Sequence, residues 1–117
     1  MRHDDLVYVG QMVDVARKLD ERRARLSREA FDADEDVQLA LTHLIQTLGE
    51  VARRLSPAFC AAHPEVPWTA IVGMRHKIVH DYLSVDFDLV WDVVTIEVPA
   101  LLPKLAALLP DGPAERS

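Results

Sequence analysis

The chain has 117 residues, of which 50% are hydrophobic and 27% are charged, and its 13 Lys and Arg against 19 Asp and Glu give a formal net charge of -6. This length suits one domain, and the composition excludes a disordered or collagen-like protein. The acidic balance argues against a protein that coats nucleic acid through a broad basic surface, but not against a small local basic site. We expect a single domain over residues 1–110 and a flexible tail over residues 111–117.

Cysteine content and the N-terminal sequence bear on the cellular compartment. The single cysteine, Cys60, cannot form an internal disulfide. The stretch from Met1 to Asp5 lacks the apolar region of a signal peptide, and no segment approaches the roughly 18 apolar residues of a membrane span. We therefore expect a cytoplasmic protein without membrane association.

Two long amphipathic helices are predicted in the first half of the chain. Apolar residues at steps of three and four predict the first over about residues 5–26, with Asp4 or Asp5 capping its first N–H groups. A 4-3-4-3-4 spacing predicts the second over residues 37–55, behind the acidic run 34–36 that suits the positive end of a helix dipole. Gly49 lies inside the second helix at a cost of roughly 1 kcal/mol relative to alanine, which favours a close helix contact there.

The middle of the chain predicts a loop and a short helix. Three prolines between Ser56 and Pro67 indicate a connecting loop, because the residue before a proline is disfavoured in the helical region. A third helix then begins, with Pro67 at its first position, and its apolar residues continue towards His80.

A fourth helix is predicted after Asp86, which is placed to cap it. Pro99 and Pro103 each remove a backbone donor, so we expect a kink between Thr95 and Pro99. The apolar stripe of this helix comprises Leu89, Val93, Ile96, Leu101, Leu105 and Leu108. With no internal repeat and no alternating strand pattern, the sequence predicts an all-α, up-and-down four-helix bundle with a kinked last helix, and its wide apolar stripes are compatible with a homodimer.

Reactive side chains are concentrated in the segment 73–82, which holds two His, one Arg, one Lys, one Asp and one Tyr. Histidine transfers protons near neutral pH, and Arg and Lys bind phosphate, so this combination is typical of phosphodiester chemistry. On a continuous helix Arg75 and His80 would point about 140° apart. They converge if the helix ends near Val79 or if a second subunit supplies one of them, and both routes predict a site at a helix end. In the alternative interpretation the segment has no catalytic role: Arg75 and Asp81 form surface ion pairs and His80 caps the helix C-terminus.

Other groupings admit competing interpretations. Cys60-x2-His63 and His76-x3-His80 imitate the ligand spacing of a small zinc site, but two prolines and no strand signal lie between them. Cys60 itself is interpreted as a loop or core residue rather than a catalytic thiol. A basic cluster at the end of the first helix is interpreted as a solvated helix end, with an RNA or partner contact as the alternative; it comprises Arg22, Arg23, Arg25 and Arg28. Arg53 and Arg54 receive the same interpretation.

The pattern Arg75-x4-His80-x-Tyr82 resembles the Arg-x4-His-x-Tyr signature of HepT-like proteins, a branch of the HEPN (higher eukaryote and prokaryote nucleotide-binding) superfamily. The similarity covers nearly the whole chain in order and at similar spacing. It includes the segments 48–55, 64–68, 71–75 and 90–99. One position differs, because His76 stands where this family commonly has Asn.

The resemblance implies a small homodimeric bundle of HEPN type that is the toxin of a prokaryotic, type VII-like toxin–antitoxin system. It implies a metal-independent RNA endonuclease that needs no cofactor and that pairs with a minimal nucleotidyltransferase antitoxin of the MNT type. Carried over, Arg75 and His80 are the catalytic pair, His76 and Lys77 are accessory candidates, and Tyr82 accepts AMP from the antitoxin. The alternative is a non-catalytic binding module that partners or sequesters a nucleotidyltransferase.

Overall fold

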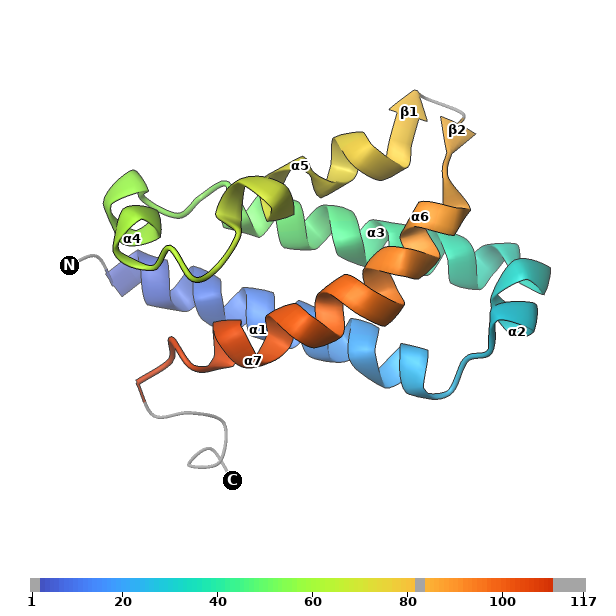
Figure 1. Cartoon of the computed structure of the whole chain (residues 1–117), viewed down its shortest axis with the longest axis horizontal. Coiled ribbons are helices and arrows are strands. Elements are labelled where there is room, and N and C mark those ends of the chain that lie inside the picture. Colours follow the sequence, from blue (N-terminus) through green and yellow to red (C-terminus); the bar gives the residue numbers. More distant parts are fainter. Residues whose placement is uncertain (1–2, 82–83, 111–117) are drawn as a thin grey trace.

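The computed structural model describes residues 3–81 and 84–110, without the side chains of His3, His80 and Asp81. The predicted tail, residues 111–117, therefore lies outside the described residues, as does Tyr82. The described chain folds into long helical segments that run alternately up and down a molecule of 44 × 33 × 19 Å (Figure 1). This arrangement confirms the all-α, up-and-down bundle. None of the helices in the described ranges is long and apolar enough to cross a lipid bilayer.

The two long helices are α1 (His3–Ala24) and α3 (Glu35–Ala52). Asp34 caps α3, because its carboxylate accepts a hydrogen bond from the backbone N–H of Val37 at 3.2 Å. Asp4 or Asp5 was expected to cap α1, but the helix begins at His3 and both residues lie within its first turn, so Asp5 is not the cap. Its buried carboxylate instead accepts the backbone N–H of Ser56 at 2.9 Å and the Ser56 hydroxyl at 2.8 Å. The bonds to Asp5 tie the start of α1 to the chain that follows α3.

Two short helices were not predicted. Helix α2 (Arg28–Ala33) follows the N-cap Ser27 and buries one aromatic ring. Helix α4 (Pro57–Ala62) occupies part of the expected loop and begins at the N-cap Ser56, whose hydroxyl accepts the N–H of Phe59. The prolines misled the prediction because a proline in the first helical turn removes only an N–H that would have no partner there.

Helix α5 (Trp68–Ile78) is the predicted third helix. Pro67 stands at its N-cap with φ -81° and ψ 73°, one position before the place expected for it. The helix ends at Ile78 because Val79 adopts extended backbone angles, φ -110° and ψ 106°. The chain therefore leaves the helix before it reaches His80.

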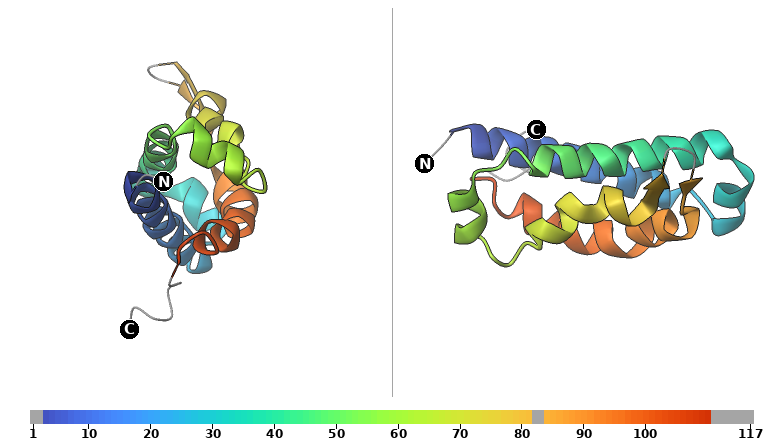
Figure 2. Two further views of the ribbon diagram at one scale, coloured as in Figure 1. Left: turned by 90° about the vertical axis from the view of Figure 1, so that its left-hand side faces the viewer. Right: turned by 90° about the horizontal axis from the view of Figure 1, so that it is seen from above.

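A small antiparallel pair of strands, β1 (Val79–Asp81) and β2 (Ser84–Val85), follows α5. It contradicts the expectation that the chain has no strands, since segments of three and two residues are too short to show an alternating pattern. The backbone N–H of Asp86 donates to the Ile78 carbonyl at 2.7 Å and closes the base of the pair. Both strands project beyond the packed helices (Figure 2).

The last helical segment is continuous but not uniform. It comprises α6 (Phe87–Asp92), the π-helical turn η1 (Val93–Glu97) and α7 (Val98–Ala106). Asp86 caps α6 as predicted, accepting the N–H of Leu89 at 3.1 Å. The π-turn lies where the kink was expected, next to Pro99, which has no N–H to offer the preceding turn. The wider π-turn changes which side chains of the helix face the core, so Ile96 is 64% exposed rather than part of the apolar stripe.

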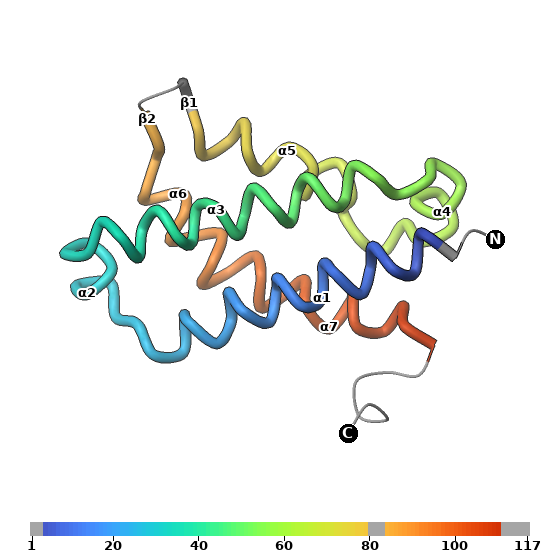
Figure 3. The backbone as a smooth tube through the Cα atoms, turned by 180° about the vertical axis from the view of Figure 1, so that it is seen from behind, coloured from blue at the N-terminus to red at the C-terminus, as the bar shows by residue number. Residues whose placement is uncertain are grey.

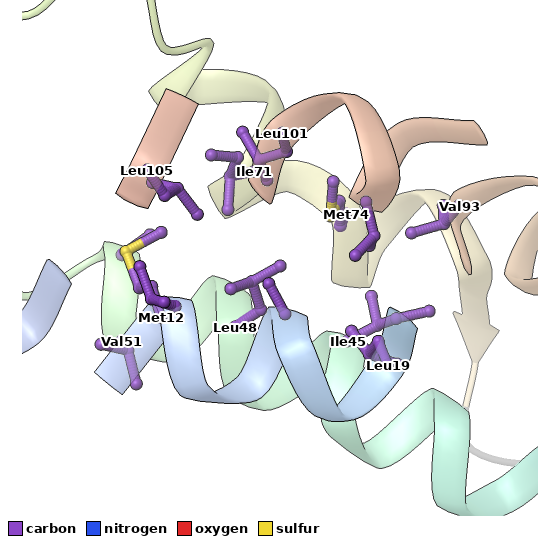
Figure 4. Close-up of a cluster of buried hydrophobic side chains, with 14 of the residues drawn as sticks. Met12, Leu19, Ile45, Leu48, Val51, Ile71, Met74, Val93, Leu101 and Leu105 are labelled. Carbon is purple, nitrogen blue, oxygen red and sulfur yellow. The ribbon is translucent and has the colours of Figure 1, made fainter. Parts of the chain in front are cut away.

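The core lies between the four helical segments, and Figure 4 shows its side chains meeting from α1, α3, α5, η1 and α7. Helices α3 and α5 lie side by side and run in opposite directions (Figure 3). A methyl group added to Gly49 of α3 would lie 3.1 Å from the carbonyl oxygen of Ile71 in α5. The predicted close contact at Gly49 is thereby confirmed.

The basic cluster near the end of α1 is divided between two helices. Arg28 belongs to α2, and the prediction that it forms part of the solvated end of the first helix is wrong. Its guanidinium bonds to Asp32 at 2.9 Å and to Asp88 of α6, and it lies 5.9 Å from the ring centroid of Trp91. The hydrogen bonds to Asp88 and Asp32 raise the pKa of Arg28. Arg23, in contrast, makes a local pair with Asp20 at 2.8 Å.

Candidate functional site

The last turn of α5 presents three basic side chains to solvent: Arg75, His76 and Lys77. Met74 and Ile78, which are 3% and 0% exposed, anchor the same turn in the core. Positive groups at this position are favoured by the negative end of the helix dipole. The alternation of buried and exposed positions therefore holds the basic face in a fixed orientation.

Of the two conditions under which Arg75 and His80 could converge, the first, a helix end near Val79, is met, because α5 ends at Ile78. The separation of about 140° expected between Arg75 and His80 on a continuous helix therefore does not apply. His80 stands on β1, two residues beyond the end of the helix. The pairing of Arg75 with the His80 side chain, and the role of Tyr82, stay predictions.

A depression of about 500 Å³ lies beside Arg75, between α3 and α5. Helix α3 contributes three residues to its wall, its C-cap Arg53 contributes a fourth, and α5 contributes three. They are Gln46, Gly49, Glu50, Arg53, Val72, Arg75 and His76. Within the part of the chain that the structure describes, the side chains of Arg75 and His76 have no hydrogen-bond or ion-pair partner. An arginine without a counter-ion at the edge of a depression can bind an anionic ligand such as a phosphate.

Arg53 is a functional candidate that the sequence analysis interpreted first as part of a solvated helix end, with an RNA or partner contact only as the alternative. Its Nη1 atom lies 3.6 Å from the Oε2 atom of Glu50, and these side chains are 62% and 55% exposed. A signal for it existed in the sequence, since Gln46, Gly49, Glu50 and Arg53 follow the i, i+3, i+4, i+7 spacing of one helix face. The same face contains Gly49, which makes the close contact with α5.

Lys77 has a different environment from Arg75 and His76. Its Nζ atom lies 3.1 Å from the Oε2 atom of Glu97, which joins α5 to the π-turn of the last helix. Lys77 does not line the depression. Its described contact is structural, and an accessory role in chemistry stays a prediction.

The alternative interpretations of Cys60 find no support in the described part of the chain. Among the side chains described there, which do not include His80, no three His, Cys, Asp or Glu residues are grouped closely enough to hold a metal ion. Cys60 is half-buried, and burial and then the charge of Asp5 raise the pKa of its thiol. A nucleophilic cysteine requires the opposite shift.

Comparison with known proteins adds a family to this geometry. The family described as "Ribonuclease HepT-like" matches residues 12–108. Similar curated proteins include "Putative RNase TTE0752" of Caldanaerobacter subterraneus subsp. tengcongensis, 29% identical over 102 residues that cover 87% of this chain and 91% of the relative. "Probable ribonuclease HepT" of Thermococcus cleftensis is 27% identical over 108 residues, covering 92% and 98%. "Putative RNase MJ0127" of Methanocaldococcus jannaschii is 26% identical over 83 residues, covering 71% and 69%. No solved structure is significantly similar.

Proposed function

Because the chain belongs to the HepT-like ribonuclease family, we propose that it is a metal-independent RNA endonuclease that binds the scissile phosphate at the end of α5. The observation that carries this proposal is the setting of Arg75. Its exposed guanidinium borders the depression between α3 and α5 and has no partner among the described residues. The end of α5 also brings the chain directly from Arg75 to the strand that bears His80.

The proposed reaction uses the RNA 2′-hydroxyl as the nucleophile. The 2′-oxygen attacks the adjacent phosphorus and the bond from phosphorus to the 5′-oxygen breaks, which leaves a 2′,3′-cyclic phosphate and a 5′-hydroxyl. His80 assists by taking the proton of the 2′-hydroxyl or by giving one to the leaving oxygen. Arg75 stabilises the negative charge that develops on the phosphoryl oxygens.

We also propose that the protein is a homodimeric toxin of a type VII-like toxin–antitoxin system. Its partner is a minimal nucleotidyltransferase of the MNT type, which attaches AMP to Tyr82. Tyr82 follows His80 by two residues, so the adduct would add bulk and a negative phosphate beside the proton-transfer group. RNA would then be excluded by steric overlap and by charge repulsion.

Cleavage in excess EDTA tests the nuclease. Unmodified wild-type protein is expected to cut single-stranded RNA, and His80→Ala and Arg75→Ala are each expected to reduce the rate by about 100-fold or more. A substrate with 2′-deoxyribose throughout should not be cut. Activity that survives both substitutions would refute the proposed site, and a wild-type protein without activity and without attached AMP would favour the binding module.

Modification is tested separately with a minimal nucleotidyltransferase of the MNT type and ATP. Intact mass spectrometry should show one or more AMP units on the wild-type protein and none on Tyr82→Phe. Cleavage by the modified wild-type protein should fall in parallel, whereas Tyr82→Phe should continue to cut RNA. AMP attached to Tyr82→Phe at the wild-type level would overturn the assignment of this residue.

A further inference from the structure

The polar face of α3 borders the same depression as Arg75 but has no part in the proposed chemistry. We propose that Arg53 binds a second phosphate of the RNA backbone, next to the phosphate held at Arg75. This inference rests on the proposed function, because it assigns a further part of the same substrate to the same site. It makes the depression a groove for an RNA strand rather than a pocket for a single nucleotide.

The spacing of the two arginines supports a strand with several phosphates. Helices α3 and α5 run in opposite directions and touch where Gly49 meets Ile71 and Val72 (Figure 3). Arg53 lies four residues beyond this contact along α3, and Arg75 lies three or four residues beyond it along α5. At 1.5 Å per residue the two positions are therefore about 11 Å apart along the helices. One phosphate is small compared with this distance, whereas neighbouring phosphates of one strand can occupy both ends of the depression.

Charge around the depression favours the same ligand. Two arginines face one carboxylate there, Glu50, so the depression is locally cationic although the chain carries a formal net charge of -6. The Arg53–Glu50 pair is long, at 3.6 Å, and both side chains are more than half exposed. Exposed pairs of this kind contribute little to stability, so a phosphate can replace the carboxylate at little cost. The planar guanidinium can then bind two phosphate oxygens at once.

Arg54 provides a matched control. It is the next residue at the same end of α3, and it is exposed, but it does not line the depression. Arg54→Ala therefore removes the same charge from the same helix end without changing the proposed phosphate site. Thermal melting and gel filtration of each variant will establish that the fold is intact.

Binding is measured on protein that carries His80→Ala, so that the RNA is not consumed. A fluorescent single-stranded oligoribonucleotide is titrated at several salt concentrations between about 50 and 200 mM. Adding Arg53→Ala is expected to weaken binding by about 10-fold and to reduce the slope of log affinity against log salt by about 0.7. Adding Arg54→Ala is expected to change the affinity by less than about 2-fold and to leave the slope unchanged. Glu50→Gln is expected to tighten binding by about 2-fold, because it removes the competing negative charge.

The assignment of Arg53 to a phosphate site would be overturned if Arg53→Ala and Arg54→Ala reduced RNA affinity equally. It would also be overturned if Glu50→Gln bound RNA more weakly than the parent protein, or if no form of the protein bound RNA. Cleavage by otherwise wild-type protein separates this result from the proposed function. An Arg53→Ala enzyme with raised KM and nearly unchanged kcat supports a binding role. Wild-type cleavage together with an Arg53→Ala enzyme that behaves like Arg54→Ala refutes the Arg53 site alone. Loss of binding at Arg53 in a protein that does not cut RNA refutes the nuclease and supports the phosphate site.

Discussion

Replacing Gly49 with alanine tests the closest contact between α3 and α5. Two contributions oppose one another in this variant. Alanine gains about 1 kcal/mol over glycine inside a helix. The new Cβ atom, however, would lie 3.1 Å from the carbonyl oxygen of Ile71 and 3.6 Å from that of Val72, and these are backbone atoms of a packed helix rather than the ends of flexible side chains.

Overpacking of this kind costs about 2 kcal/mol, so the net expectation is a loss of about 1 kcal/mol in the free energy of unfolding. For a chain of this size that loss corresponds to a decrease of roughly 4 °C in Tm. Urea denaturation should show a lower midpoint with an unchanged slope, because the surface exposed on unfolding is the same.

Gly10→Ala is the matched control, since no heavy atom outside the local helix lies within 4 Å of the Cβ position at Gly10 in α1. This variant should gain about 1 kcal/mol from helix propensity alone. A Gly49→Ala protein as stable as Gly10→Ala would show that α5 moves aside freely. The close contact would then not limit how α3 and α5 pack.

Three further predictions concern a buried carboxylate, a helix cap and the thiol. Asp5→Ala should lower the free energy of unfolding, measured by urea denaturation, by about 2 kcal/mol, because it removes both hydrogen bonds to Ser56. Asp4 is exposed, so Asp4→Ala should change this free energy by less than about 0.5 kcal/mol. Equal losses in the two variants would contradict the prediction. Asp34→Ala removes the N-cap of α3 and should cost about 1 kcal/mol by the same assay; no change would show that water replaces the cap. Burial raises the pKa of Cys60 above 9.0, so the folded protein loses its thiol proton at a higher pH than the unfolded protein does. The free energy of unfolding should therefore fall as the pH rises past 9.0. Cys60→Ser should remove this decline.

The long helices could be predicted from the sequence because their burial repeats over many turns. The 4-3-4-3-4 series predicted α3, and its members Leu41, Leu48 and Val51 are buried in that helix, whereas Leu55 lies beyond its end. The six-residue helices α2 and α4 offer too few apolar positions for a period to be seen. Their caps were nevertheless readable, since Ser56 followed by Pro57 is a typical helix start. The strand pair forms because Val79 leaves the helix, a choice that no periodicity encodes.

The site could be predicted only in part, for a different reason. The unusual density of reactive side chains in one segment identified the end of α5. Arg53, in contrast, becomes relevant only when α3 is known to lie beside α5, and the sequence does not state which helices are neighbours. Gly49 indicated a close contact but not the helix that makes it. The i, i+3, i+4, i+7 stripe from Gln46 to Arg53 identifies a face, and the structure identifies what that face lies against.

The contact at Gly49 also links the stability of the fold to the geometry of the proposed RNA groove. It sets the spacing of α3 and α5, and therefore the distance between Arg53 and Arg75 across the depression. Gly49→Ala would widen this spacing while both charges stay in place, so RNA affinity and Tm should fall together. Arg53→Ala removes a charge while the spacing is kept, so affinity should fall at nearly constant Tm. A loss of cleavage accompanied by a lower Tm therefore indicates altered helix spacing, and a loss at constant Tm indicates a missing contact to the RNA.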